Sequence, residues 1–125
     1  ATLLADGRVL VAGGGAWGGV TAGLSACEVF DPPTNQWTPG GSLANPRGMH
    51  TATLLSDGRV LIAGGESASW PRAECEIYNP ITRNWTAAGN LAVTRNLHTA
   101  TLLPSGRVLA AGADDNGHGG NAGGR

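Results

Sequence analysis

Short apolar runs separated by turn residues recur along the chain, and each group of runs predicts four strands. Residues 50–55 are rich in Thr and Leu and predict a first strand. Residues 59–65 are apolar at consecutive positions, which indicates a second strand covered on both faces. Residues 75–78 predict a third strand and residues 84–89 a fourth. No segment has a helical period, so we predict an all-β chain.

Turn residues mark the ends of these strands. The Asp-Gly pair at 57–58 predicts a two-residue type I′ hairpin, because both turn positions of that hairpin need positive φ. The Asn-Pro pair at 79–80 opens the turn between the third and fourth strands. The doubled glycine at 64–65 ends the second strand and allows a close backbone approach that any side chain would block.

The same elements return along the chain. The string at 1–14 is identical to the string at 52–65 at 12 of 14 positions, and a variant of it occupies 100–113. A second block, 27–49, matches 75–97 at 10 of 23 positions, with an offset of 48 residues. A unit of this length with four short antiparallel strands is typical of a β-propeller blade.

The recurring residues resemble kelch repeats of the bacterial, galactose-oxidase-like variety. The resemblance rests on the doubled glycine, the FDP or YNP turn, the Trp that follows it and the Arg-x-x-His sequence before the next repeat. It covers residues 1–113. The resemblance implies kelch-type β-propeller blades, each a four-stranded antiparallel sheet, in an incomplete ring.

We expect one partial propeller domain over residues 1–125. Blade one spans 1–49 and blade two 50–97, while 98–113 supply the first two strands of a third blade and 114–125 form a Gly-rich tail. Propellers close with roughly four to eight blades. We therefore expect that the open sheet faces are covered either by the remaining blades of a longer parent chain, which we favour, or by self-association.

Composition narrows the classes of partner. The chain has 21 glycines among 125 residues, but they show no three-residue period, which excludes collagen. A hydrophobic content of 41% with 14% charged residues argues against disorder. The net charge of -1 argues against nucleic acid as a partner, and no apolar run is long enough for membrane insertion.

Several polar residues occupy one position in every repeat, and we interpret them as structural. We expect Arg47 and Arg95 to pair with Glu28 and Glu76, because a carboxylate inside an apolar strand needs a nearby cation. Such a bridge would tie the third strand of a blade to the loop that enters the next blade. The predicted structural residues are Gly13, Gly14, Gly64, Gly65, Trp37, Trp85, Glu28, Glu76, Arg47, Arg95, His50 and His98.

The cysteines and the tyrosine carry no predicted chemistry. Cys27 and Cys75 lie at equivalent positions of neighbouring sheets, roughly 10 Å apart, which is too far for a disulfide, so we predict two free buried thiols. The copper-radical oxidases that the resemblance implies bind copper with two Tyr and two His, one Tyr being crosslinked to a Cys. This chain has Tyr78 alone, in the turn motif, where Phe30 is its counterpart. We expect no metal, no cofactor and no catalytic residue.

The residues that break the repeat are the candidates for ligand binding. In a meander of four strands the Asp-Gly turns share one rim, the hairpin rim, with the turns at 31–36 and 79–84. The loops at 15–26, 66–74 and 114–121 share the other rim, the loop rim, with the crossovers between blades. The unrepeated candidates on the loop rim are Trp17, Trp70, Arg72, Glu66, Asp114, Asp115 and His118.

Two interpretations of these loop-rim residues stay open. Exposed Trp beside Arg and carboxylate suits a carbohydrate or peptide site, which needs an aromatic platform and directional hydrogen bonds. The alternative is that both tryptophans fold over blade edges as lids. Our first hypothesis is a non-catalytic extracellular or cell-surface module that binds a protein or glycan. Our second is a scaffold part of a secreted copper-radical, galactose-oxidase-like oxidase with its catalytic residues outside this chain.

Overall fold

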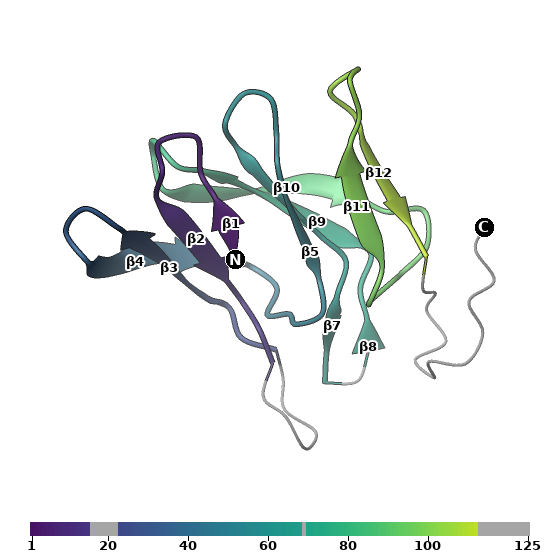
Figure 1. Cartoon of the computed structure of the whole chain (residues 1–125). Helices are drawn as coiled ribbons and strands as arrows, with labels where there is room; N and C mark the ends of the chain where they lie inside the picture. Colours follow the sequence, from purple (N-terminus) through teal and green to yellow (C-terminus); the bar gives the residue numbers. More distant parts are fainter. Residues whose placement is uncertain (16–22, 69, 113–125) are drawn as a thin grey trace.

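The computed structural model describes residues 1–15, 23–68 and 70–112, which form strands and no helix (Figure 1). The strands are β1 (Thr2–Leu3), β2 (Val9–Ala12), β3 (Ala26–Asp31), β4 (Gln36–Ser42), β5 (Thr51–Leu54), β6 (Val60–Ala63), β7 (Glu66–Ser67), β8 (Trp70–Pro71), β9 (Glu74–Asn79), β10 (Asn84–Asn90), β11 (Thr99–Leu102) and β12 (Val108–Ala111). Within the described ranges, no helix is long and apolar enough to span a membrane. The prediction of an all-β chain is confirmed.

The strands form two complete four-stranded antiparallel sheets and a third pair. The first sheet has the order β1-β2-β3-β4, and the second has the order β5-β6-β9-β10. β11 and β12 pair as the first two strands of a further sheet, and β7 and β8 form a separate short hairpin. The meander order within each sheet is that of a propeller blade, so the predicted blade architecture is confirmed.

The two complete sheets share one register at the third strand. Glu28 of β3 lies opposite Val11 of β2, and Glu76 of β9 lies opposite Ile62 of β6. Each glutamate therefore takes the same place relative to the apolar second strand. β12 carries Ala110 at the position that Ile62 has in β6, since the two positions are 48 residues apart.

The core lies where the first two sheets pack against each other. Its buried cluster consists of Leu4, Leu10, Cys27, Val29, Leu43, Val60, Ile62 and Tyr78. The consecutive apolar residues of β6 are all buried or half-buried, as expected for a strand covered on both faces. β12 has the same run of apolar residues in its sequence. Its Leu109 is nevertheless 54% exposed, because no described element covers that face of the strand.

The hairpins between first and second strands are not the predicted type I′ turns, so that prediction is wrong. Gly7 and Gly58 have positive φ, whereas the aspartate before each does not. The N–H of Gly7 donates to the carbonyl of Leu4 at 3.0 Å, and the N–H of Leu4 donates to the carbonyl of Arg8 at 2.8 Å. This is the three-residue loop with a left-handed glycine. The Asp6 carboxylate accepts the N–H of Arg8 at 3.0 Å, which accounts for an aspartate at this position of the turn.

The loop at 66–74 contains the β7–β8 hairpin, which the sequence pattern does not predict. Glu66 lies opposite Pro71, and Ser67 lies opposite Trp70. Two-residue strands are too short to produce an apolar period, which is why this hairpin leaves no signal in the sequence. In Figure 1 it lies at the bottom of the view, opposite the turns that join β1 to β2 and β11 to β12.

The doubled glycines fix the crossovers between blades. The N–H of Gly65 donates to the carbonyl of Arg95 at 2.8 Å. A Cβ added at Gly64 would lie 2.5 Å from that same carbonyl oxygen, which is closer than real Cβ contacts allow. The first blade repeats the arrangement, with a Cβ at Gly13 lying 2.6 Å from the carbonyl oxygen of Arg47. Both crossovers therefore need glycine at the end of the second strand.

We predict that Gly64→Ala destabilises the fold more than Gly89→Ala does. Both glycines have positive φ, so each substitution carries about 1 to 2 kcal/mol of backbone strain. Only at Gly64 would the added Cβ also clash with a backbone atom, and this clash adds roughly 1 to 3 kcal/mol to the loss of stability. Denaturant unfolding of the two variants measures the difference, and equal losses of stability would contradict the close-approach argument.

Candidate functional site

A buried guanidinium links the first two blades. Arg47 lies in the crossover between β4 and β5, and its side chain is 0% exposed. Its Nη2 binds Oε2 of Glu76 at 2.9 Å, and its Nη1 donates to the carbonyls of Gly64 and Glu74 at 2.9 and 2.5 Å. Its Nε donates to the carbonyl of Asn45 at 3.2 Å. Burial lowers the pKa of Arg47, and the Glu76 carboxylate opposes that shift.

The Glu76 carboxylate is satisfied by the crossover on its other side. Oε1 accepts the N–H of Ala44 at 2.7 Å, and Oε2 accepts the N–H of Asn45 at 3.2 Å. The predicted bridge from the third strand of a blade to the loop that enters the next blade, which would join Arg47 to Glu28 and Arg95 to Glu76, is wrong. Arg47 instead binds Glu76 of the blade that its own crossover enters, because that crossover packs against the third strand of blade two. A buried ion pair whose hydrogen bonds are all made in this way has a structural role, because none of its polar groups is available to a substrate.

The counterpart residues at the two ends of the chain are arranged differently. Arg95 donates from Nη1 to the carbonyl of Gly112 at 3.0 Å, as Arg47 does to Gly64. Glu28 lies exposed on β3 and has no ion-pair partner among the described residues. The structure thus brings together one Arg–Glu pair of the repeat, at the interface between blades one and two.

The repeated tryptophans also differ in their contacts, because only Trp85 reaches a neighbouring blade. Trp85 packs against Tyr78, with ring centroids 4.9 Å apart, and its Nε1 donates to the carbonyl of Gly40 in blade one at 2.9 Å. Trp37 packs against Phe30 in the same way, with centroids 5.0 Å apart, but it is 54% exposed. Trp37 lies on the outer side of blade one, where no described residue offers a carbonyl to its indole N–H as Gly40 does to that of Trp85.

The repeated histidines lie inside the fold. Nε2 of His98 forms a hydrogen bond with Oγ1 of Thr51 at 2.9 Å. Nδ1 of His50 and Nδ1 of His98 are buried and have no hydrogen-bond partner in the described part of the chain. Burial lowers the pKa of His50 to about 4 and also lowers the pKa of His98, so both rings are neutral at pH 7. These positions fit the structural interpretation.

On the loop rim, the structure places Trp70 at the β7–β8 hairpin with 75% of its surface exposed. Nη1 of Arg72 lies 3.5 Å from Oε1 of Glu74, and Oε2 of Glu66 accepts from Nδ2 of Asn96 at 2.6 Å. Glu66 and Arg72 are thus held in place while the indole of Trp70 stays open to solvent. The other loop-rim candidates, which lie outside the described residues, are Trp17, Asp114, Asp115 and His118.

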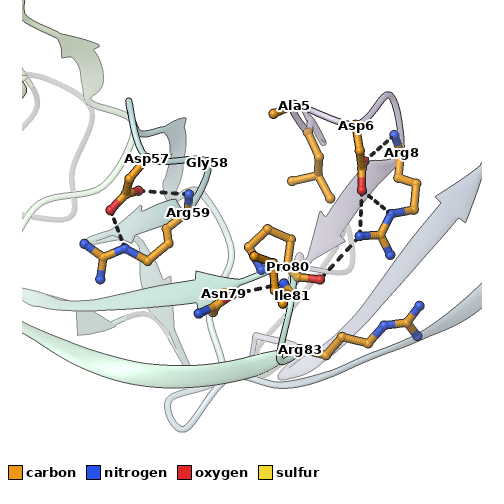
Figure 2. A pocket seen from close by; sticks show the side chains of 11 residues that line it. Ala5, Asp6, Arg8, Asp57, Gly58, Arg59, Asn79, Pro80, Ile81 and Arg83 are labelled. Carbon is orange, nitrogen blue, oxygen red and sulfur yellow. Dashed lines mark hydrogen bonds and ion pairs between the residues drawn. The ribbon is translucent and has the colours of Figure 1, made fainter.

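A cavity of about 550 Å³ opens on the hairpin rim, where the sequence pattern predicts no candidate site (Figure 2). The turn of blade one, the turn of blade two and the β9–β10 turn converge on it. Its lining residues are Leu4, Ala5, Asp6, Arg8, Asp57, Gly58, Arg59, Asn79, Pro80, Ile81 and Arg83. The Asp-Gly-Arg tripeptide that recurs in both turns is a signal of this cavity in the sequence, and the sequence pattern alone assigns it only a hairpin.

The charges around this cavity are largely paired. Asp6 binds Arg8 at 2.8 Å and Asp57 binds Arg59 at 2.7 Å. The backbone N–H of each arginine lowers the pKa of its aspartate. Nη2 of Arg8 also donates to a carbonyl of the β9–β10 turn at 3.3 Å, which Figure 2 shows as a link across the cavity. Arg83 lies apart from the two pairs and donates toward blade one.

The described residues do not fit a copper site. They contain no group of three His, Cys, Asp or Glu side chains that could hold a metal ion. Tyr78 is buried in the core with its hydroxyl unpartnered, and burial raises its pKa. Cys27 and Cys75 are free and buried, as predicted, and burial raises the pKa of both thiols, which makes them unreactive.

Comparisons with known proteins agree on the blade type. Residues 1–44 match the family model of the Kelch motif. A fungal alcohol oxidase of the AA5 family, solved in complex with copper, matches with a TM-score of 0.75 and 22% identity over 86% of this chain. This chain spans about a quarter (25%) of that oxidase. No curated protein matches the sequence. At this identity the likeness shows the fold, and the fold alone assigns no activity.

We predict that Glu76→Gln lowers the free energy of unfolding by about 3 kcal/mol, because it leaves the buried Arg47 charge without a counter-ion. Glu28→Gln is the matched control, since Glu28 has the same repeat position but is exposed. Its loss should stay within about 0.5 kcal/mol. Urea unfolding of both variants tests this, and a similar loss in the two would remove the case for a structural ion pair.

We also predict that the fold loses stability in acid through His50. The unfolded histidine takes up a proton near its ordinary pKa of 6.5, whereas the native one does so only at about 4. The unfolded state therefore binds more protons between these values, so stability is full above about pH 6.5 and falls toward pH 4. Melting temperatures of wild type and His50→Asn at pH 7 and pH 4.5 measure this. The acid-induced drop should be smaller in the variant, and an identical drop would refute the assignment.

Proposed function

Because the chain is built of kelch-type propeller blades, we propose that it acts as a non-catalytic binding module with its ligand site on the loop rim. The single observation that carries this proposal is the exposure of Trp70. An indole with 75% of its surface in solvent gains little from folding, so its position is better explained by a ligand that covers it.

The surroundings of Trp70 support a glycan or protein ligand. Trp70 lies on a short hairpin that is anchored by the strand pairing of Glu66 with Pro71. The isolated bridge between Gly48 and Glu66 ties this hairpin to the crossover of the preceding blade. The aromatic face is therefore presented from a fixed base, and the half-buried Arg72, two residues further along the chain, is a source of hydrogen-bond donors on the same rim. The lid alternative fits Trp70 poorly, because a lid would bury the ring.

Location and partners follow from the same proposal. A glycan ligand favours an extracellular or cell-surface position. We propose that the open sheet faces are covered by further blades of a longer chain or by self-association, since exposed apolar faces favour association. Nucleic acid and membrane are not proposed as partners, given the net charge of -1.

A second candidate is a scaffold segment of a galactose-oxidase-like copper enzyme. The observation that favours it is the TM-score of 0.75 to the AA5 alcohol oxidase. In that case we expect the copper ligands outside this chain. The residues that the structure describes contain no group of three donor side chains that could hold a metal ion. Activity of the longer protein on alcohols, with this segment contributing no ligand, would favour the scaffold over the binding module.

We predict that a glycan ligand changes the intrinsic tryptophan fluorescence of the wild type and that Trp70→Ala weakens binding by roughly tenfold or more, as expected for a stacking platform. Trp37→Ala is the control, because Trp37 is also exposed but lies on β4, away from the loop rim. The titration uses oligosaccharides of known composition. Unchanged emission across the panel, with circular dichroism showing a folded protein, would reject glycan binding at this site.

A further inference from the structure

The segment at 78–83, which forms the turn between β9 and β10, breaks the repeat on the hairpin rim. It differs from the matching segment of blade one at four of six positions. Asn79 stands where blade one has Asp31, which removes a negative charge. Arg83 stands where blade one has Asn35, which adds a positive charge. The repeat itself therefore does not require the charge that this turn carries.

Arg83 is held in a backbone conformation that arginine rarely adopts. Its φ is 59°, in the left-handed region, where blade one has Asn35 at a φ of 56°. Asparagine tolerates this region because its short side chain bonds locally, whereas arginine is strained there. The side chain of Arg83 is exposed, and its contacts to Thr38 and Pro39 of blade one are long, at 3.4 and 3.5 Å. These contacts do not explain the strain, and strained residues cluster at binding sites.

Ile81 adds an apolar wall beside this charge. It is 90% exposed, and it stands where blade one has Pro33. A single exposed isoleucine is common on a protein surface, but this one lines the hairpin-rim cavity together with Ala5 and Pro80. Figure 2 shows the guanidiniums of Arg8 and Arg83 on the same side of this turn. The cavity therefore offers a ligand both apolar surface and cationic hydrogen-bond donors.

The lining of the cavity carries a net positive charge. Three arginines line it, Arg8, Arg59 and Arg83, against two aspartates. Each aspartate is already held by an arginine and a backbone N–H of its own turn. Burial raises the pKa of Tyr78 at the base of the turn, and the charges of Arg83 and Arg8 oppose that rise more strongly than the Asp6 carboxylate adds to it. The field at this point is therefore positive, which suits an anion.

We propose that this cavity is a second binding site, which takes a small organic carboxylate with a hydrocarbon chain of a few carbons. The guanidiniums of Arg83 and Arg8 bind the carboxylate, because a planar guanidinium matches it in shape and charge. Ile81 packs against the hydrocarbon chain. The volume of about 550 Å³ is typical of small-molecule sites. The cavity lies on the opposite rim from Trp70, so it stands or falls independently of the binding function proposed above.

The site is formed by blades one and two alone. All of its lining residues belong to these two complete blades, and the chain enters β1 and leaves β12 on the loop rim, away from the cavity (Figure 1). A small anion also suits it better than an added strand of a polypeptide. Three turns bound the cavity, and no free strand edge lines it, so it has no template for main-chain pairing.

The test titrates the isotope-labelled whole chain with hexanoate and follows the backbone amide signals by NMR. We expect saturable shifts in the turns at 5–8 and 79–83 and none at the β7–β8 hairpin. Arg83→Asn should weaken binding about tenfold, because it removes a charged donor. The variant carries the blade-one residue, which tolerates this φ, so we expect it to fold at least as stably as the wild type. Ile81→Ser should weaken binding about fivefold through lost apolar contact.

Arg107→Gln is the matched control, since Arg107 is an exposed arginine in the β11–β12 turn of the same rim but does not line the cavity. It should bind hexanoate like the wild type. Acetate and hexanol should each bind roughly tenfold more weakly than hexanoate, because one lacks the chain and the other the charge.

Three results would overturn the proposal. The first is equal affinity of the wild type and Arg83→Asn, with circular dichroism showing both folded. The second is an equal loss of affinity in Arg107→Gln, because it would reduce the binding to a general attraction of anions to the rim. The third is the absence of shifts in the turns at 5–8 and 79–83 at saturating hexanoate.

Discussion

The buried Arg47–Glu76 pair is the contact on which the packing of one blade against the next depends. It takes two charges out of water in a chain with few charged residues, and that is stable only when every donor and acceptor is used. Arg47 meets this condition with Glu76 and three backbone carbonyls, while Glu76 accepts two backbone N–H groups of the crossover. The crossover is thereby fixed from the side of blade two.

The doubled glycines complete this link from the side of blade one. The N–H of Gly14 donates a hydrogen bond to the carbonyl of Arg47. The guanidinium of Arg47 in turn donates to the carbonyl of Gly64 in blade two. Arg95 repeats both contacts one blade further on. Each arginine is therefore a backbone anchor in one sheet and a side-chain anchor in the next. Trp85 adds a parallel connection through its indole N–H and the carbonyl of Gly40.

The sequence predicts most of the fold because each blade reuses the same residues. The strand order and the free buried Cys27 and Cys75 follow from the recurrence. That a carboxylate in an apolar strand needs a cation also follows, because burying an unpaired charge is costly. Which arginine supplies the cation does not follow, since the sequence does not show that Arg47 packs against the following blade and binds Glu76. The turn type does not follow, because an Asp-Gly pair serves both the two-residue and the three-residue hairpin, and the aspartate decides between them by binding Arg8. The β7–β8 hairpin is too short to leave a pattern.

The candidate sites are harder to predict, because a binding surface depends on which repeated residues meet and which stay unpaired. Asp6 and Asp57 look like turn residues in the sequence, yet the fold brings their turns together around one cavity. Arg47 and Arg95 have the same place in the repeat, yet only Arg47 meets a carboxylate among the described residues. Repetition therefore specifies the contacts within and between the described blades, and the turns that neighbouring blades bring together form a surface that no single repeat reveals.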